Sequence, residues 1–353
     1  MTVVFVILFL LAAAGAVGTG SWALQLRKQL AAAEQQLRAR VIPPPPRQAM
    51  VEPRPERVLP PPPEALPELA APSALPNVAD SEPDSTVDGA RLGRLVVRAG
   101  ATRGESNRQD GLARRQAAAT TLLSRFDPPV LLSAVAAGLP SRDHSQLGAV
   151  QACKSLHGQL SERATSLALD AAWKDAEARS GSAVADDELR RLLRAAVVEV
   201  GRSLTLAARG RNLEPENVAT GLTFMLSRLG DVPRRRHLVV GVGSGALLRV
   251  SGDGKMPAEY EEAAEPLANL PENPDQLSWR TVESGPGDVL VLCTGTTAAF
   301  LKREKEKGGP VIDWHGGSPD LVRFFWYLNQ QDTSREDHAA VALWELPPPA
   351  ASR

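Results

Sequence analysis

The sequence predicts a layered α/β domain built on a largely antiparallel sheet. Two long segments with helical spacing, 146–179 and 187–209, lie in the middle of the chain. Short apolar segments of strand character stand before and after them, separated by turn residues. Strands that surround a pair of central helices are typical of folds in which helices cover the faces of a sheet. We expect this domain to span residues 91–348, followed by a short tail at 349–353.

The first 24 residues are predicted to form a transmembrane anchor. No charged residue occurs between Thr2 and Leu24, and this apolar run is long enough to cross a bilayer as a helix. A secretory signal peptide, the alternative, would carry basic residues ahead of the apolar run, whereas Arg27 and Lys28 follow it. By the positive-inside rule, this order predicts a single-pass protein of the cell membrane with a cytoplasmic C-terminal domain.

Two further segments are expected between the anchor and the domain. Residues 25–40 are predicted to form a juxtamembrane helix, in which Leu30 and Leu37 allow a short coiled-coil seam or a fraying helix. Residues 41–90 are predicted to be a disordered, proline-rich linker, since 41–88 holds 14 of the chain's 29 prolines. We interpret the linker as a spacer, with binding of an SH3-type partner as the alternative.

Composition excludes several classes of function. The net charge of −1 argues against nucleic acid as a partner of the whole chain. Cys153 and Cys293 have no metal-site spacing and form no disulfide framework, so we expect two buried free thiols in a reducing compartment. The five histidines lack the spacing of a zinc site, and the Gly-x-Ser-x-Gly signature of serine hydrolases is absent.

Within the domain, the apolar patterns predict a definite order of elements. Before the two long helices we expect strands at 92–102 and 124–135. After them we expect strands at 219–229, 236–243, 245–254, 279–285, 288–295 and 338–346, with helices at 300–307 and 319–331 between the last two strands.

Two loops in this order have the residue types of a phosphate site. The glycine-rich segment 241–245 is followed by a strand rather than by a helix N-terminus, so it predicts a hairpin turn and not a nucleotide-binding loop. Arg234, Arg235 and Arg236 stand between two strands, where they form either a solvated hairpin loop or a site for a phosphate.

The segment 131–141, LLSAVAAGLPS, is predicted to be a buried strand that ends in a turn at Gly138 and Pro140. A rigid strand end beside an open turn is a common place for a catalytic carboxylate. Ala137 occupies that place in this chain. The segment is therefore either an ordinary core strand or an active-site strand that has lost its acid.

Six segments, taken together and in order, resemble the PP2C (PPM-type) serine/threonine phosphatases, in particular their bacterial branch. They lie at 100–118, 134–149, 219–226, 242–254, 286–301 and 335–346. The resemblance covers roughly 95–347. It implies an α-β-β-α sandwich of mainly antiparallel sheets.

The resemblance also implies where the metal-binding aspartates of the family should stand. Gln116 takes the place of the aspartate in the Q-D-A element, Ala137 takes that of A-D-G with Gly138 after it, and Gly295 takes that of C-S-D-G. Residues 242–245 match the G-D-S-R element without its acid. Only Asp337, in the closing element, remains a carboxylate and a doubtful metal ligand.

Members of the resembled family use two Mn²⁺ or Mg²⁺ ions, bridged by aspartates, to generate a hydroxide and neutralise the phosphoryl oxygens. One remaining carboxylate does not hold two such ions. The resemblance therefore implies a degenerate, pseudophosphatase-like protein without a cofactor. It would bind or scaffold a phosphoprotein or a component of a kinase pathway, with Arg103 or the loop Arg234–Arg236 supplying positive charge.

Two other hypotheses stay open from the sequence. The chain is a working Mn²⁺- or Mg²⁺-dependent phosphatase if Asp110, Asp143 or Asp313 joins Asp337 in a rearranged metal site. Alternatively, the domain is a structural part of an envelope or division assembly, and the proline-rich linker is its working part.

Overall fold

The computed structural model describes residues 83–104, 106–107, 112–179, 183–230, 232–243, 245–250, 261–263, 269–306, 317–330 and 336–347. The predicted anchor, the juxtamembrane helix and nearly all of the linker lie outside the described residues. In the part of the chain that is described, no helix is both long enough and apolar enough to span a membrane.

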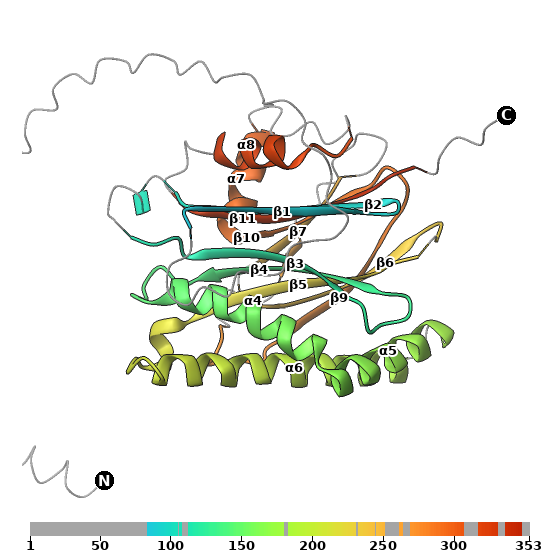
Figure 1. The fold of residues 1–353 in the computed structure, drawn as a ribbon, viewed down its shortest axis with the longest axis horizontal. Helices are drawn as coiled ribbons and strands as arrows, with labels where there is room; N and C mark the ends of the chain where they lie inside the picture. The colour runs from blue at the N-terminus through green and yellow to red at the C-terminus, as the bar shows by residue number, and fades with distance from the viewer. Residues whose placement is uncertain are drawn as a thin grey trace, which may run out of the picture. The chain divides into compact units, whose positions relative to one another are not determined.

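Two antiparallel sheets form the centre of the domain (Figure 1). Sheet A has the strand order β1 (Ser85–Leu92), β2 (Leu95–Thr102), β11 (His338–Glu345), β10 (Val289–Thr294), β7 (Gly245–Val250) and β8 (Glu261–Ala263). Sheet B has the order β3 (Gln116–Leu123), β4 (Val130–Gly138), β5 (Thr220–Arg228), β6 (Arg235–Val242) and β9 (Ser278–Ser284). The expected sandwich with antiparallel sheets is confirmed.

Helices cover the outer face of each sheet, which gives four layers (Figure 1). Sheet B carries α4 (Ser145–Ser161), α5 (Arg163–Ala178) and α6 (Ala183–Arg209), and the short 3-10 helix η1 (Pro215–Val218) leads into β5. Sheet A carries α7 (Gly295–Glu306) and α8 (Leu321–Gln330). Because both faces of both sheets are covered, the central strands read as continuous apolar runs rather than as alternating ones.

Successive residues of one strand therefore enter different cores. Leu132 packs with Leu156 and Trp173 between sheet B and its helices. Leu131, on the other face of β4, packs with Leu290 between the two sheets. A third cluster, which includes Phe324 and Trp344, lies between sheet A and its helices. Cys153 and Cys293 are both buried free thiols, as the sequence predicts.

The boundaries of several elements differ from the sequence-based expectation. Strand β1 begins at Ser85, ahead of the domain start expected at Arg91. Strand β3 was not expected, because QAAATTLL has few of the large apolar residues that mark a strand. The single helix expected over 146–179 is two helices, and Glu162 separates them by accepting a hydrogen bond from the Thr165 N–H as the N-cap of α5.

The glycine-rich segment 241–245 is a crossover and not the hairpin turn that its sequence predicts. Strand β6 ends at Val242 in sheet B, and β7 begins at Gly245 in sheet A. Backbone packs closely here: a Cβ on Gly245 would lie 2.0 Å from Thr223 Oγ1. The misassignment arises because a tight turn between strands has the same local signature whether or not those strands pair.

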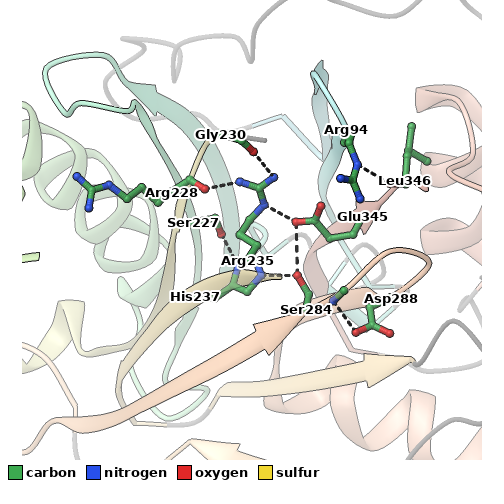
Figure 2. Close-up of polar contacts among 11 residues, drawn as sticks. Arg94, Ser227, Arg228, Gly230, Arg235, His237, Ser284, Asp288, Glu345 and Leu346 are labelled. Atoms are coloured by element: carbon green, nitrogen blue, oxygen red, sulfur yellow. Dashed lines mark hydrogen bonds and ion pairs between the residues drawn. The ribbon is translucent and has the colours of Figure 1, made fainter. Parts of the chain in front are cut away.

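A buried polar cluster connects the two sheets at the end where β5 stops and β6 starts (Figure 2). The Arg235 guanidinium donates to the Glu345 carboxylate of sheet A and to the carbonyl groups of Arg228 and Gly230. His237 lies between two hydroxyls, with Nδ1 2.8 Å from Ser227 Oγ and Nε2 2.7 Å from Ser284 Oγ. We call Ser227, Arg235, His237, Ser284 and Glu345 the cross-sheet cluster.

Burial holds the imidazole of His237 in its neutral form. Removal from water lowers the pKa of His237 to about 3, and the positive charges of Arg235 and Arg249 act in the same direction.

The first prediction concerns two glycines of α4. A Cβ on Gly148 would lie 1.8 Å from the Val218 carbonyl oxygen, so Gly148→Ala must push α4 away from η1. We expect it to lower the free energy of unfolding by about 1–3 kcal/mol or more. Gly158, exposed on the same helix, has open space around its Cβ position. Gly158→Ala should therefore raise stability by about 0.5–1 kcal/mol. Denaturant unfolding measures both, and equal effects would contradict the packing described.

The second prediction concerns acid. The unfolded chain protonates His237 near pH 6.5 and the folded chain only near pH 3, so the unfolded state binds more protons between these values. His237 therefore contributes a loss of unfolding free energy of up to about 1.4 kcal/mol per pH unit as pH falls through this window. Denaturant unfolding between about pH 6.5 and about pH 4.5, a range inside this window, measures the slope.

Two variants test this assignment. His237→Gln should show a shallower slope than the wild type. Ser227→Ala keeps the imidazole and loses one of its hydrogen bonds, so it should be less stable at every pH and keep the slope. A wild-type slope in His237→Gln would show that other groups cause the acid sensitivity.

Candidate functional site

The predicted metal positions come together at one end of the sandwich, opposite to the cross-sheet cluster. We call this the site end. Gln116 opens β3 and pairs with Ala137 near the end of β4, and Gly138 donates its N–H to the Arg115 carbonyl at 2.8 Å. Gly295 follows β10, and Asp337 directly precedes β11. The structure thus assembles all five of these positions from four strands of two sheets.

A chain of hydrogen bonds occupies the space between these positions. Gln116 accepts a hydrogen bond from Thr294 Oγ1 at its side-chain oxygen and donates from Nε2 to Thr296 Oγ1 at 2.6 Å. Thr296 Oγ1 donates in turn to the Asp337 carbonyl at 3.1 Å. Thr297 Oγ1 lies 3.0 Å from Thr294 Oγ1 and accepts from the Ala339 N–H at 3.1 Å. We call these four side chains the Gln116 bridge, since they join β3 of sheet B to β10 and β11 of sheet A.

The carboxylate of Asp337 is surrounded by N–H donors. Its Oδ1 accepts from the Gly104 N–H at 2.7 Å and from Asn107 Nδ2 at 2.9 Å, and its Oδ2 accepts from the Arg115 N–H at 2.5 Å. The residue is only 3% exposed. Such charge-assisted bonds tie the backbone at Gly104 and Arg115 to the Asp337 carboxylate.

Among the described residues, the side chains at the site end do not fit a pair of divalent metal ions. Ala137, Gly138 and Gly295 offer no side-chain oxygen, and Gln116 offers a neutral one that already accepts a hydrogen bond. Throughout the described ranges, no group of three or more His, Cys, Asp or Glu residues is placed to hold a metal ion.

The three alternative carboxylates give no closer fit. Asp143 is exposed in the loop between β4 and α4. Asp110 and Asp313 lie outside the described residues.

Thr297 and His338 at the site end are residue types that can serve as a nucleophile and its general base. Thr297 Oγ1 lies 3.3 Å from His338 Nδ1. Both residues are buried, and the Thr297 hydroxyl already contacts Thr294 and the Ala339 N–H. The pair is therefore packed in the interior beside the Gln116 bridge and is not a group that a substrate reaches.

Arg103 and Arg115 are two positively charged residues at the site end. Arg103 Nη1 pairs with the Asp84 carboxylate at 2.8 Å, and its Nη2 donates to the Asn107 carbonyl at 2.9 Å. Arg115 Nη1 donates to the Pro140 carbonyl at 3.2 Å at an exposed position. Arg103 was a candidate from the sequence, whereas Arg115 was missed, although it stands next to Gln116.

The other phosphate candidates lie at the opposite end. Strand β4 ends and β5 begins at the site end, where Gly138 pairs with Thr220, so the hairpin from β5 to β6 points away from it. Arg235 is buried in the cross-sheet cluster (Figure 2). Arg236 lies 3.4 Å from Asp186, and the exposed Arg234 lies 3.7 Å from Glu283. The structure does not bring Arg234, Arg235 or Arg236 together with the metal positions.

The sequence analysis also missed the threonines of the Gln116 bridge and Asn107. A usable signal existed: Thr294, Thr296 and Thr297 flank Gly295, at the position where the resembled family has an aspartate. Three hydroxyls beside a missing acid indicate hydrogen bonding in place of metal coordination.

A family model described as protein phosphatase 2C matches residues 103–334, about two-thirds of the chain. A search of curated proteins found no match.

Solved structures of several bacterial proteins are similar to the chain at low sequence identity. PppA of Pseudomonas aeruginosa, described as a key regulatory component of T6SS, is 13% identical over 72% of this chain and 98% of its own, with a TM-score of 0.43. The PPM phosphatase MsPP of Mycobacterium smegmatis is 14% identical over 73% and 100%, with a TM-score of 0.40. The serine/threonine phosphatase of S. agalactiae is 11% identical over 71% and 99%, with a TM-score of 0.48.

The assignment to a family rests on the family model and not on these structures. By that match, the chain belongs to the protein phosphatase 2C family.

Proposed function

We propose that this protein is a PP2C-like pseudophosphatase, which binds or scaffolds a phosphoprotein or a component of a kinase pathway without hydrolysing it. The observation that carries the proposal is the burial and hydrogen bonding of the Asp337 carboxylate. The carboxylate retained among the metal positions accepts three N–H donors and is buried. A metal ion at Asp337 would compete with these donors and would find no second carboxylate among Gln116, Ala137 and Gly295.

Metal-assisted phosphoryl transfer needs a bound hydroxide and a positive clamp on the transferring oxygens. The described side chains of the site end supply neither a hydroxide nor a base that a substrate reaches. They do supply two guanidinium groups, Arg103 and Arg115, near an end of the sandwich that is held rigidly by hydrogen bonds. Guanidinium groups suit the binding of phosphate esters, which favours recognition over turnover.

The proposal includes a location. With an apolar anchor at 1–24 and a proline-rich linker after it, the domain would sample a volume close to the cytoplasmic face of the cell membrane. This part rests on the sequence alone.

An active phosphatase with rearranged ligands is the main competing proposal. It requires Asp143, or an acid outside the described residues, to approach Asp337 and replace at least one of its N–H donors. A structural role in an envelope assembly is the other competing proposal, and it would place the function in the linker rather than at the site end.

The third prediction follows from the donor set. Titration of Mn²⁺ into the purified full-length protein by calorimetry should show no specific binding. Hydrolysis of p-nitrophenyl phosphate in the same samples should not depend on the metal. The matched variants are Asp337→Asn and Asp143→Asn, and both should match the wild type in these assays. Metal-dependent turnover that disappears in either variant would establish the active enzyme instead.

A further inference from the structure

Metal ions that bind side chains from several strands would hold the ends of those strands together. A domain without the ions must hold these strand ends together in another way, which we call closure of the site end. The described residues show what lies there instead. The Gln116 bridge links β3 to β10 and to the start of β11. The Asp337 carboxylate holds Gly104, at the end of β2, and Arg115, at the start of β3.

We propose that the Gln116 bridge and the Asp337 carboxylate together replace the metal ions as the closure of the site end, so that the surface bearing Arg103 and Arg115 keeps a single conformation without any metal. The inference rests on the proposed function, because it assigns Gln116 and Asp337 as positioning residues for the binding surface of that function.

The two parts of this closure are continuous. Thr296 Oγ1 accepts from Gln116 and donates to the main-chain carbonyl of Asp337, whose side chain then accepts from Arg115, the residue before Gln116. The hydrogen bonds therefore return to the strand where they begin. Linked bonds of this kind stabilise one another in a buried setting, and the loss of one weakens the others.

The closure also determines where the two arginines lie. The N–H groups that Asp337 binds belong to Arg115 itself and to Gly104, the neighbour of Arg103. Asn107, a further donor to Asp337, accepts from the Arg103 guanidinium at its carbonyl. A change at Asp337 thus reaches both guanidinium groups through the main chain.

The fourth prediction is a measurement of amide hydrogen exchange by mass spectrometry on the full-length protein, in peptides that cover Gly104 and Arg115. In the wild type, protection of these amides should be the same in excess EDTA and in excess Mn²⁺. In Asp337→Asn, a side-chain NH₂ must face an N–H donor whichever way the amide lies. Exchange at these positions should therefore become at least about tenfold faster, as expected for the loss of a charge-assisted hydrogen bond.

Two matched controls separate local from global effects. Asp143→Asn changes an exposed carboxylate in the loop after β4 and should leave the exchange unchanged. Ser227→Ala weakens the cross-sheet cluster at the far end, so it should not selectively speed exchange at the site end. If Asp337→Asn does not fold, Asn107→Ala removes a single donor to the same carboxylate and should speed exchange of the Gly104 amide several-fold.

A double-variant test examines the continuity of the closure. Gln116→Leu removes both hydrogen bonds of the amide at similar size, and it should speed exchange at Arg115 several-fold. The double variant with Asp337→Asn should exchange less fast than the product of the two single effects predicts, because both changes break one closed chain of bonds. Multiplicative effects would show that the two parts act separately.

Other outcomes overturn the proposal. Protection that rises with Mn²⁺ or falls with EDTA would show that a metal closes the site end, even if no turnover is seen. Unchanged protection in Asp337→Asn would show that the carboxylate positions nothing. Conversely, metal-dependent phosphatase activity combined with metal-independent protection would remove the proposed function and leave the closure intact.

Discussion

The hydrogen bonds between Gln116 and the threonines around Gly295 cross the gap between the two sheets where both sheets stop. A sandwich of this kind is dry in its middle, where Leu131, Leu290 and their neighbours pack, but at its ends the backbone turns and must find hydrogen-bonding partners. Gln116 provides a donor and an acceptor at the site end, and it is only 6% exposed. Through this one amide, β3 is linked to β10 and, by way of Thr296, to the main chain at Asp337 just before β11.

At the opposite end of the sandwich, a charged pair provides the polar contacts between the two sheets. Arg235 of sheet B meets Glu345 of sheet A, both buried, and further hydrogen bonds satisfy the guanidinium. A buried ion pair adds little net stability compared with apolar residues, yet removal of one partner costs about 3–5 kcal/mol, because a charge is left unpaired. Such a pair fixes how the sheets align. It also explains why an arginine that looks like a phosphate ligand in the sequence is a structural residue in the fold.

Elements with strong apolar runs could be predicted from the sequence, and so could the grouping of the metal positions. Strands β4, β6 and β10 and helix α6 follow directly from buried residues in the expected spacing. Strand β3 was not predicted because alanine has a low strand propensity. The segment after Val242 was wrongly predicted to be a hairpin turn, because the pairing of two strands depends on contacts that are distant in the sequence. The roles of Arg115 and Arg235 depend on partners more than one hundred residues away or on main-chain groups, as in the bond between Arg235 and Glu345. No local pattern contains that information.

The residue types at the site end determine how strongly charged groups repel one another there. Several aspartates in one place repel one another unless metal ions neutralise them, by roughly 4 kcal/mol for two charges about 4 Å apart at an effective dielectric constant of about 20. Because Gln116, Ala137 and Gly295 carry no charge, these positions do not repel Asp337, whose carboxylate accepts hydrogen bonds from N–H donors. An aspartate introduced at Ala137 would stand next to Gly138, whose N–H donates to the Arg115 carbonyl, and the Arg115 N–H donates to the Asp337 carboxylate. The two carboxylates would repel each other, and this repulsion would destabilise the site end unless a metal ion were bound.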